Sequence, residues 1–110
     1  MEVKAITKNV RMSPQKVREV TRQIQGLPVL DAQAILARVP RKSARLVAKT
    51  LKSAVANAEN NANARPERLF VKEAVAQTAF RLKRFIPKAR GSAGPIIKRH
   101  SHIKIVVADI

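Results

Sequence analysis

The chain has 110 residues, which is one ordinary domain, and its 45% apolar and 3% aromatic content predicts a core of Val, Ile, Leu and Ala. It carries 23 Lys and Arg against 7 Asp and Glu, a net charge of +16, which predicts an anionic partner: nucleic acid, an anionic membrane or an acidic protein. The absence of cysteine and of any apolar run of about 18 residues excludes disulfides, thiolate metal sites and membrane-spanning helices.

The first residues of the chain predict a strand and then a helix. Residues 2–9 alternate weakly between apolar and polar side chains, which indicates a short strand. Ser13 is a favourable N-cap residue, Pro14 fits the first helical position, and Gly26 is expected to stop the helix. The apolar face of this helix consists of Val17, Val20, Thr21 and Ile24.

Two further helices are predicted in the middle of the chain. Residues 29–38 predict a short helix, which Pro40 ends. Residues 41–60 predict a longer helix, and half of its apolar stripe is alanine, so another element is expected to pack very close to it. The stripe consists of Ala44, Val47, Ala48, Leu51, Ala54, Val55 and Ala58.

Cations lie on one flank of two of these helices. Arg18 and Arg22 fall together beside the apolar face of the first helix. The flank of the third helix carries Arg45, Lys49 and Lys52. These side chains are either ordinary solvated charges or a stripe that faces phosphates, and their alignment favours phosphate contact.

After Pro66 the apolar period changes from helical to alternating, which indicates strands. Residues 69–79 and 96–108 predict two strands. The residues between them, 87–95, concentrate Pro, Gly and Ser, which is typical of the tip of a long β-hairpin.

The predicted hairpin has an extreme charge pattern. Residues 74–108 contain no Asp or Glu. Their cations are Arg81, Lys83, Arg84, Lys88, Arg90, Lys98, Arg99 and Lys104. Two strands alone are marginally stable in water, and this charge makes them repel each other. We therefore expect a dense polyanion, such as folded RNA, to impose the conformation of the hairpin and to bind it with a steep salt dependence.

Other classes of function fit the sequence less well. Solvated loops usually mix both charge signs, and a membrane-surface segment needs an amphipathic basic helix with aromatic residues opposite the charges. No zinc finger, RRM signature or basic zipper is present, and cations spread over several elements suit a folded RNA read by shape and phosphates. A DNA-architectural protein of the nucleoid type, with a basic β-arm in the minor groove, remains the alternative.

Catalysis and metal binding are not expected. No pair of acids has a useful spacing, no Gly-rich phosphate loop is present, and Ser13 is interpreted as a cap rather than a nucleophile. His100 and His102 are two residues apart, but no third ligand is near in sequence and their neighbours are cationic. We therefore expect RNA hydrogen bonding or packing from these histidines, and no metal or cofactor.

Four motifs resemble one protein family. Residues 11–18, RMSPQKVR, resemble the R-x-S-P-x-K-x-R opening of large-subunit ribosomal protein number twenty-two of the bacterial type. Residues 53–61, SAVANAENN, are similar to its S-A-x-A-N-A-x-x-N helix end. Residues 82–91, LKRFIPKARG, resemble its L-K-R-x-x-P-R-A-R-G hairpin, and residues 98–103, KRHSHI, resemble its K-R-T-S-H-I return strand. The four motifs follow the family's order and spacing and cover essentially the whole chain.

The resemblance implies an α+β fold in which three helices pack on a small three-stranded antiparallel sheet with a long protruding β-hairpin. We expect a single domain over 1–110, with a globular part at 1–78 and 103–110, an extended hairpin at about 79–102 and its tip at about 85–96. It also implies a structural constituent of the large ribosomal subunit in the cytoplasm. The implied partners are large-subunit ribosomal RNA, neighbouring ribosomal proteins and the nascent polypeptide, with no membrane and no homo-oligomer.

The resemblance further implies that the globular part lies near the polypeptide exit and that the hairpin lines the exit tunnel. The residues expected to bind ribosomal RNA are Arg11, Ser13, Lys16, Arg18, Arg22, Arg41, Lys42, Arg45, Lys49, Lys52, Asn57, Asn60, Arg81, Lys83, Arg84, Lys88, Arg90, Lys98, Arg99, His100, Ser101 and His102. The residues expected to line the tunnel are Arg84, Ile86, Pro87, Lys88, Ala89, Arg90, Gly91, Ser92 and Ala93.

The chain departs from the family pattern in two places. Residues 77–80 read QTAF where many members carry D-E-G-P, so the local acids are missing and Phe80 is added at the hairpin base. Ser92, Gly94 and Pro95 replace the usual tip residues, with the loss of two cations and one acid. This change predicts a less basic and stiffer tunnel constriction.

Overall fold

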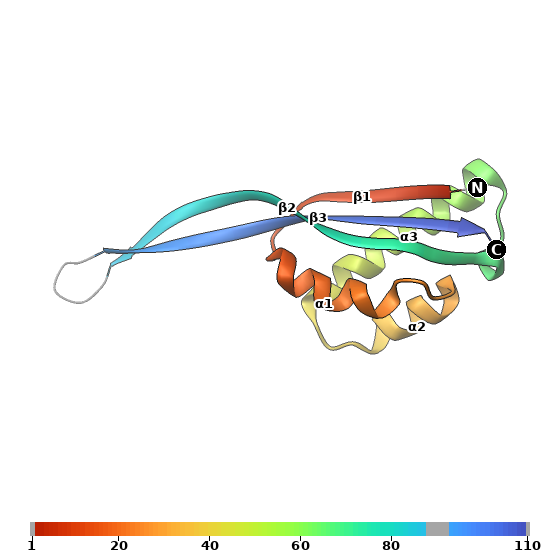
Figure 1. The fold of residues 1–110 in the computed structure, drawn as a ribbon, viewed down its shortest axis with the longest axis horizontal. Helices are drawn as coiled ribbons and strands as arrows, with labels where there is room; N and C mark the ends of the chain where they lie inside the picture. Colours follow the sequence, from red (N-terminus) through yellow and green to blue (C-terminus); the bar gives the residue numbers. More distant parts are fainter. Residues whose placement is uncertain (1, 88–92, 110) are drawn as a thin grey trace.

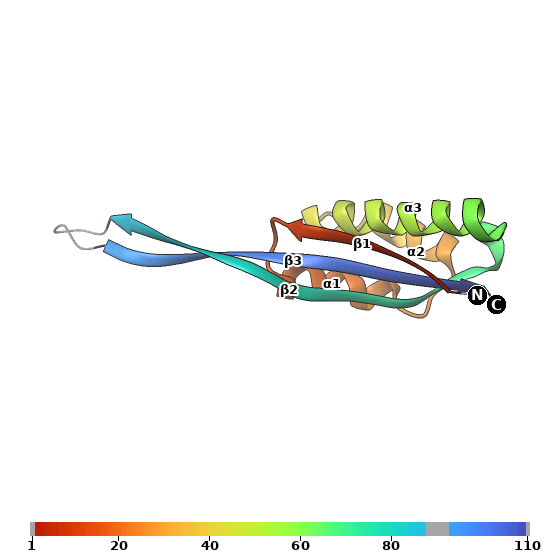
Figure 2. The same ribbon diagram turned by 90° about the horizontal axis from the view of Figure 1, so that it is seen from above.

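The computed structural model describes residues 2–87 and 93–109, without the side chains of Arg81 and of residues 83–87 and 93–97. Its elements in chain order are β1 (Glu2–Val10), α1 (Pro14–Ile24), α2 (Val29–Arg38), α3 (Lys42–Ala62), the short 3-10 helix η1 (Pro66–Arg68), β2 (Leu69–Pro87) and β3 (Ala93–Asp109). The three α-helices cover one face of the sheet, and β2 and β3 continue beyond them as a long two-stranded arm (Figures 1 and 2). The molecule is consequently elongated, with a longest dimension of 62 Å.

The sheet has three antiparallel strands in the order β1-β3-β2, so the last strand of the chain lies in the middle. Ile103 shows the central position of β3, because it pairs with Thr7 of β1 on one side and with Ala76 of β2 on the other. The expected α+β fold of three helices on a three-stranded antiparallel sheet with a protruding hairpin is confirmed.

The core lies between this sheet and the helices. Alternate side chains of β3 point at the helices, which buries Ile103, Ile105 and Val107 completely. The helices contribute the predicted apolar stripes, and the fully buried alanines of α3, Ala44, Ala54 and Ala58, let that helix pack closely. A 2.7 Å hydrogen bond between the hydroxyl groups of Thr7 and Thr50 links β1 to α3 across this interface.

The ends of α1 follow the sequence prediction in position but not in every contact. Ser13 is the N-cap residue and Pro14 the first helical residue, but the Ser13 hydroxyl makes no capping hydrogen bond. Gly26 has φ +83, a conformation that glycine adopts without strain. Its N–H donates to the carbonyl of Val71 at 2.8 Å, and the N–H of Val71 donates to the carbonyl of Leu27 at 2.8 Å. This turn therefore ties the end of α1 to β2.

Several boundaries differ from those predicted. Helix α3 continues to Ala62, where Asn63 ends it in the left-handed conformation with φ 51, and η1 was not predicted. Strand pairing of the hairpin extends beyond residues 79 and 96 and reaches Pro87 opposite Ala93. Proline and glycine are tolerated there because each strand of a two-stranded ribbon has one edge without a partner strand.

Candidate nucleic-acid interface

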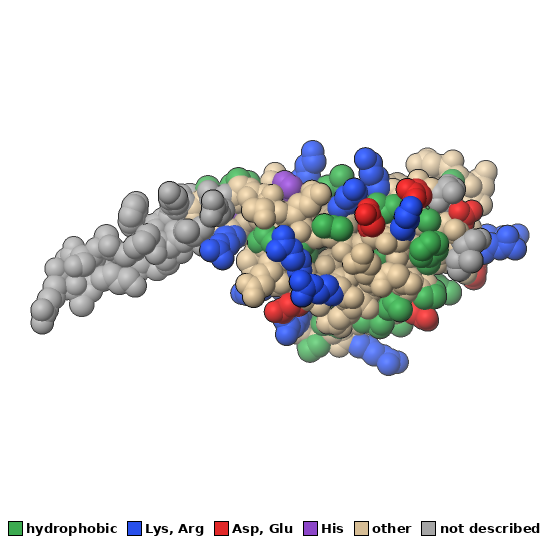
Figure 3. Space-filling view, in the orientation of Figure 1, with side chains coloured by type: hydrophobic (Ala, Val, Ile, Leu, Met, Phe, Trp, Pro, Cys, Tyr) green, Lys and Arg blue, Asp and Glu red, His purple; other side chains and the backbone are tan. Residues whose placement is uncertain are grey.

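The cations expected to bind RNA lie on the surface of the body, and Figure 3 shows part of their distribution. On the helices and the segments before them, the exposed members are Arg11, Lys16, Arg18, Arg22, Arg41, Lys42, Arg45, Lys49 and Lys52. Lys98 and Arg99 of β3 are also exposed. Helix α3 begins near the base of the arm and runs away from it, so Asn57 and Asn60 lie toward the opposite end of the body (Figures 1 and 2).

Part of this charge gathers where the arm leaves the body. Three open clefts meet there, with volumes of about 420, 270 and 590 Å³, and we call them the root clefts because Arg99 lines all three. Their described lining includes the cations Arg11, Lys16, Arg18, Lys42, Lys98 and Arg99 and no Asp or Glu. The start of α1, the start of α3 and the return strand thus contribute to one basic surface, which is suited to a phosphate backbone.

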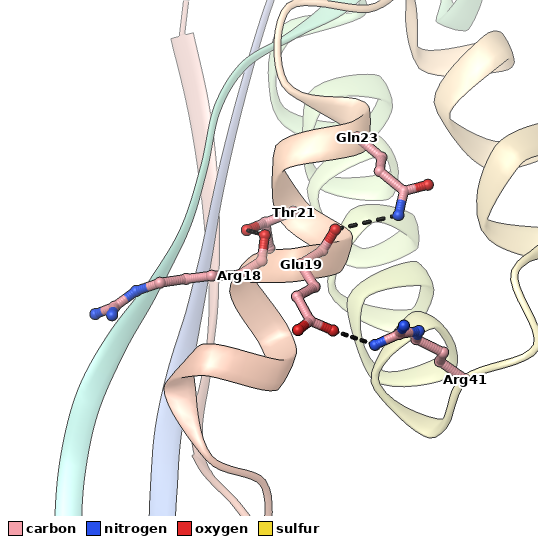
Figure 4. Close-up of polar contacts among 5 residues, drawn as sticks. All are labelled: Arg18, Glu19, Thr21, Gln23 and Arg41. Atoms are coloured by element: carbon pink, nitrogen blue, oxygen red, sulfur yellow. Dashed lines mark hydrogen bonds and ion pairs between the residues drawn. The ribbon is translucent and has the colours of Figure 1, made fainter.

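Three acids of the body form ion pairs outside the root clefts. Glu19 of α1 forms an ion pair with Arg41, whereas Arg18 points the other way across β2 and its Nε donates to the carbonyl of Ala76 at 3.3 Å (Figure 4). The pairing with Glu19 offsets the charge of Arg41. The charge of Arg18, by contrast, lies at a root cleft whose described lining contains no acid to offset it.

Two more ion pairs lie on the sheet. The hydrogen bond from Lys72, reinforced by its charge, lowers the pKa of Glu2, and the same contact raises the pKa of Lys72. Glu73 lies 3.9 Å from Lys104. These acids offset cations of the sheet and leave those of the root clefts uncompensated.

The return strand carries two buried polar side chains at the arm root. His100 is 7% exposed and Ser101 is fully buried, and among the residues that the structure describes neither the Nδ1 atom of His100 nor the Oγ atom of Ser101 has a hydrogen-bond partner. His100 lines two of the root clefts, and its ring stacks on Phe80 with 4.1 Å between ring centroids. A buried polar atom without a hydrogen-bond partner lowers the free energy of unfolding by about 1–3 kcal/mol. These two atoms, which lie where the arm leaves the body, can therefore still form hydrogen bonds.

Comparison with known proteins shows which family the chain belongs to. The family model described as "Ribosomal protein L22p/L17e" matches residues 5–108. The chain belongs to this family. The proteins named "Large ribosomal subunit protein uL22" from Opitutus terrae and Acholeplasma laidlawii are 53% and 50% identical to it. These matches cover 99% of this chain and 96% and 98% of the two relatives. The protein of the same name from Chloroflexus aggregans is 50% identical over 99% of this chain and 96% of its own length.

The fold of this ribosomal protein brings some of the predicted RNA-binding residues together and separates others. Arg11, Ser13 and Arg18, from the opening motif, meet Arg99 and His100 of the return strand at the root clefts. The predicted contacts with described side chains that do not line these clefts are Arg22, Arg41, Arg45, Lys49, Lys52, Asn57, Asn60, Ser101 and His102. Those whose side chains or positions lie outside the described residues are Arg81, Lys83, Arg84, Ile86, Pro87, Lys88, Ala89, Arg90, Gly91, Ser92 and Ala93.

The histidines of this ribosomal protein have different surroundings. His102 is half-buried, and its Nδ1 accepts a hydrogen bond of 3.1 Å from the backbone N–H of Asn9, which fixes the end of β1. His100 instead packs on Phe80 at the arm root. Within residues 2–87 and 93–109, no His, Asp or Glu side chains form a group of three that could hold a metal, and no helix is long and apolar enough to cross a membrane.

The stacked pair of Phe80 and His100 is the feature of the site that sequence reasoning missed. The available signal was the aromatic residue at the hairpin base, in place of the family's usual proline. If the register of the body, in which Thr78 pairs with Ser101, continued into the arm, Phe80 would lie opposite Arg99 and not opposite His100.

Proposed function

We propose that the protein is a structural constituent of the large ribosomal subunit, where it binds and organises large-subunit ribosomal RNA. Membership of a family of ribosomal proteins supports this role. The observation that carries the proposal is the basic surface of the root clefts, where six cations from α1, α3, β3 and the segment before α1 gather without an acid in the described lining. A structural scaffold of this kind needs no catalytic group.

The mechanism of binding that we propose is charge neutralisation over a wide surface. Each phosphate that a Lys or Arg neutralises releases counterions, and this gain in entropy makes binding strong at low salt. The exposed cations of α1 and α3 would contact one part of the RNA while those of the root clefts and the arm contact others. Contacts that are far apart on the protein would hold different RNA segments in a fixed relation.

For the arm we propose the role that the family resemblance implies. The body would lie near the polypeptide exit, and the arm would line the tunnel with its tip, beside neighbouring ribosomal proteins and the nascent chain. Two features support this placement. The arm is only two strands wide and extends the molecule to 62 Å, and its sequence from residue 74 to residue 108 contains no acid that RNA would repel.

Sedimentation and competition test the RNA-binding proposal. The protein should travel with large subunits through a low-salt gradient and leave them only in salt of molar order, because its contacts are mainly to phosphates. In competition at equal salt, the isolated protein should prefer large-subunit ribosomal RNA to a kinked DNA duplex. Strong binding to the duplex without binding to the ribosomal RNA would favour a DNA-architectural protein and overturn the proposal.

Charge reversal at the tip tests the division of labour between body and arm. Arg84→Glu with Arg90→Glu should weaken placement of the tip while the protein still joins the subunit, because the cations of the helices and root clefts are unchanged. Chemical footprinting of the RNA in purified subunits would show local exposure at the tunnel. Complete failure to assemble would show that the tip, and not the body, anchors the protein.

A further inference from the structure

Phe80 is an exposed aromatic ring at the base of the arm, stacked on His100, which lines two of the root clefts. It is 49% exposed, and it is the only aromatic residue among the exposed large hydrophobic side chains in the described part of the chain. Its ring stacks on the imidazole of His100 at an interplanar angle of 17°. His100 in turn is 7% exposed, so the buried imidazole supports one face of the phenyl ring.

A β-bulge holds the ring in this position. Thr78 pairs with Ser101 and Arg81 pairs with Arg99, so two residues of β2, Ala79 and Phe80, lie opposite the single residue His100. A bulge of this kind redirects a side chain relative to regular pleating. The Phe80 side chain is therefore set on His100 by the backbone, and the ring does not depend on a partner for its orientation.

The surroundings of the ring determine what it can bind. His100, which supports Phe80, lines root clefts together with Arg11, Arg18 and Arg99. A membrane anchor or an apolar protein partner would need further exposed apolar side chains beside the ring, and here the clefts are cationic. An aromatic ring stacked on a residue that lines cationic clefts matches a nucleotide whose base stacks on the ring while its phosphates meet the cations.

We propose that the outer face of Phe80 stacks against an unpaired nucleobase of RNA at the arm root. This inference rests on the proposed function, because it assumes that the root clefts hold an RNA backbone. Arg11 and Arg99 would contact the phosphates that flank the stacked nucleotide. Stacking reads no base edge, so any of the four bases would fit, and the RNA feature recognised is a base splayed out of its helix.

The composition of the chain allows a direct test. It contains no Trp and no Tyr, so the variant Phe80→Trp would carry a single tryptophan whose fluorescence reports on this position alone. On addition of large-subunit ribosomal RNA, stacking should quench the emission and protect the residue from acrylamide. The matched control is Leu30→Trp on α2, because Leu30 is 51% exposed and lies on an element that does not line the root clefts.

Affinity measurements complete the test. Phe80→Ala should weaken RNA binding by about 5- to 150-fold, the range of one lost base–aromatic stack. Phe80→Tyr should keep the affinity, and Phe80→Leu, which keeps the apolar bulk but loses the aromatic face, should resemble Phe80→Ala. Circular dichroism spectra of each variant should match that of the parent, since a half-exposed ring contributes little to the core.

The outcomes separate this inference from the function on which it rests. Unchanged affinity of Phe80→Ala together with unquenched tryptophan at position 80, while the RNA still binds, would overturn the stacking and leave the proposed function intact. Quenching in assembled subunits but not with RNA alone would assign the ring to a neighbouring protein and also overturn it. If the parent protein does not bind the RNA, the proposed function itself fails.

Discussion

The body and the arm of the molecule are held in shape in different ways. In the body, the helices cover one sheet face and bury residues such as Leu51 and Ile105 completely. Beyond the bulge at Phe80, the arm consists of two paired strands, without a covering helix in the part that the structure describes. The radius of gyration is 16.9 Å, against about 13 Å for a compact chain of this length. The described part of the arm therefore lacks the helix-covered core that stabilises the body, and we expect a polyanion to hold the arm in shape.

The largest expected effect concerns the body alone. Leu51→Ala should lower the free energy of unfolding by about 2–5 kcal/mol, because it removes a fully buried side chain and leaves a cavity against the sheet. Urea denaturation followed by the helical circular dichroism signal would measure the loss. Leu30→Ala is the control, because Leu30 is 51% exposed and should change the value by less than about 0.5 kcal/mol. A small loss at Leu51 would mean that the body, too, needs its partner to pack.

Removing two charges from the root clefts should lower RNA affinity and leave the stability of the body unchanged. Lys98→Gln with Arg99→Gln should weaken RNA binding about tenfold per lost phosphate contact and make the dependence of log K on log salt shallower by roughly 1 to 2. Filter binding at several salt concentrations would measure both. The urea midpoint should stay unchanged, because both side chains are exposed.

The matched control for this charge change lies at the other end of the body. Arg65→Gln with Arg68→Gln removes the same charge from two exposed positions, the N-cap and the last residue of η1, outside the root clefts. An equal loss of affinity in both double variants would mean that binding follows net charge and that the arm root is not a defined site.

A smaller effect on stability is expected at Gly26, in the turn that ties the end of α1 to β2. Gly26→Ala should lower the free energy of unfolding by about 1–2 kcal/mol, since an L-residue at φ +83 is strained. A Cβ atom at this position meets nothing within 4 Å, so backbone strain alone would act. Urea denaturation measures the change, and RNA affinity should remain that of the parent once the protein is folded. A neutral result would show that the turn to β2 relaxes.

The smallest effect is expected from the ion pair on the sheet. The pKa of Glu2 is lowered from its ordinary value of 4.5, so the contribution of the pair is present above that value and lost as the pH falls through the lowered pKa. The pKa of Lys72 is raised from 10.5, so the same contribution is lost again as the pH rises through the raised pKa.

Denaturation at several pH values tests this ion pair. Lys72→Gln should differ only slightly from the parent between about pH 4.5 and 10.5, and molar salt should remove the difference, because both groups are exposed. A difference that persists in strong acid or in molar salt would assign Lys72 a role other than the pair with Glu2.

The local order of the elements was predictable from residues near one another in sequence. Pro14, Gly26 and Pro40 mark helix ends because each restricts or frees its own backbone, and the apolar stripes of the helices follow from their spacing. The absence of acids in residues 74–108 likewise needs no structure to imply a polyanionic partner. The extension of the hairpin strands to Pro87 and Ala93 was not predictable from propensity, because pairing overrides the local preference of proline and glycine.

The sequence by itself determined the helices, the buried faces and the sign of the partner's charge, since these depend on composition and periodicity. Only the tertiary structure decided which cations meet, because the pairing of β1 with the central strand β3 brings Arg11, which follows β1, close to Arg99. It also decided the stacking of Phe80 on His100, because a bulge changes the register by one residue and leaves no trace in the alternation of either strand.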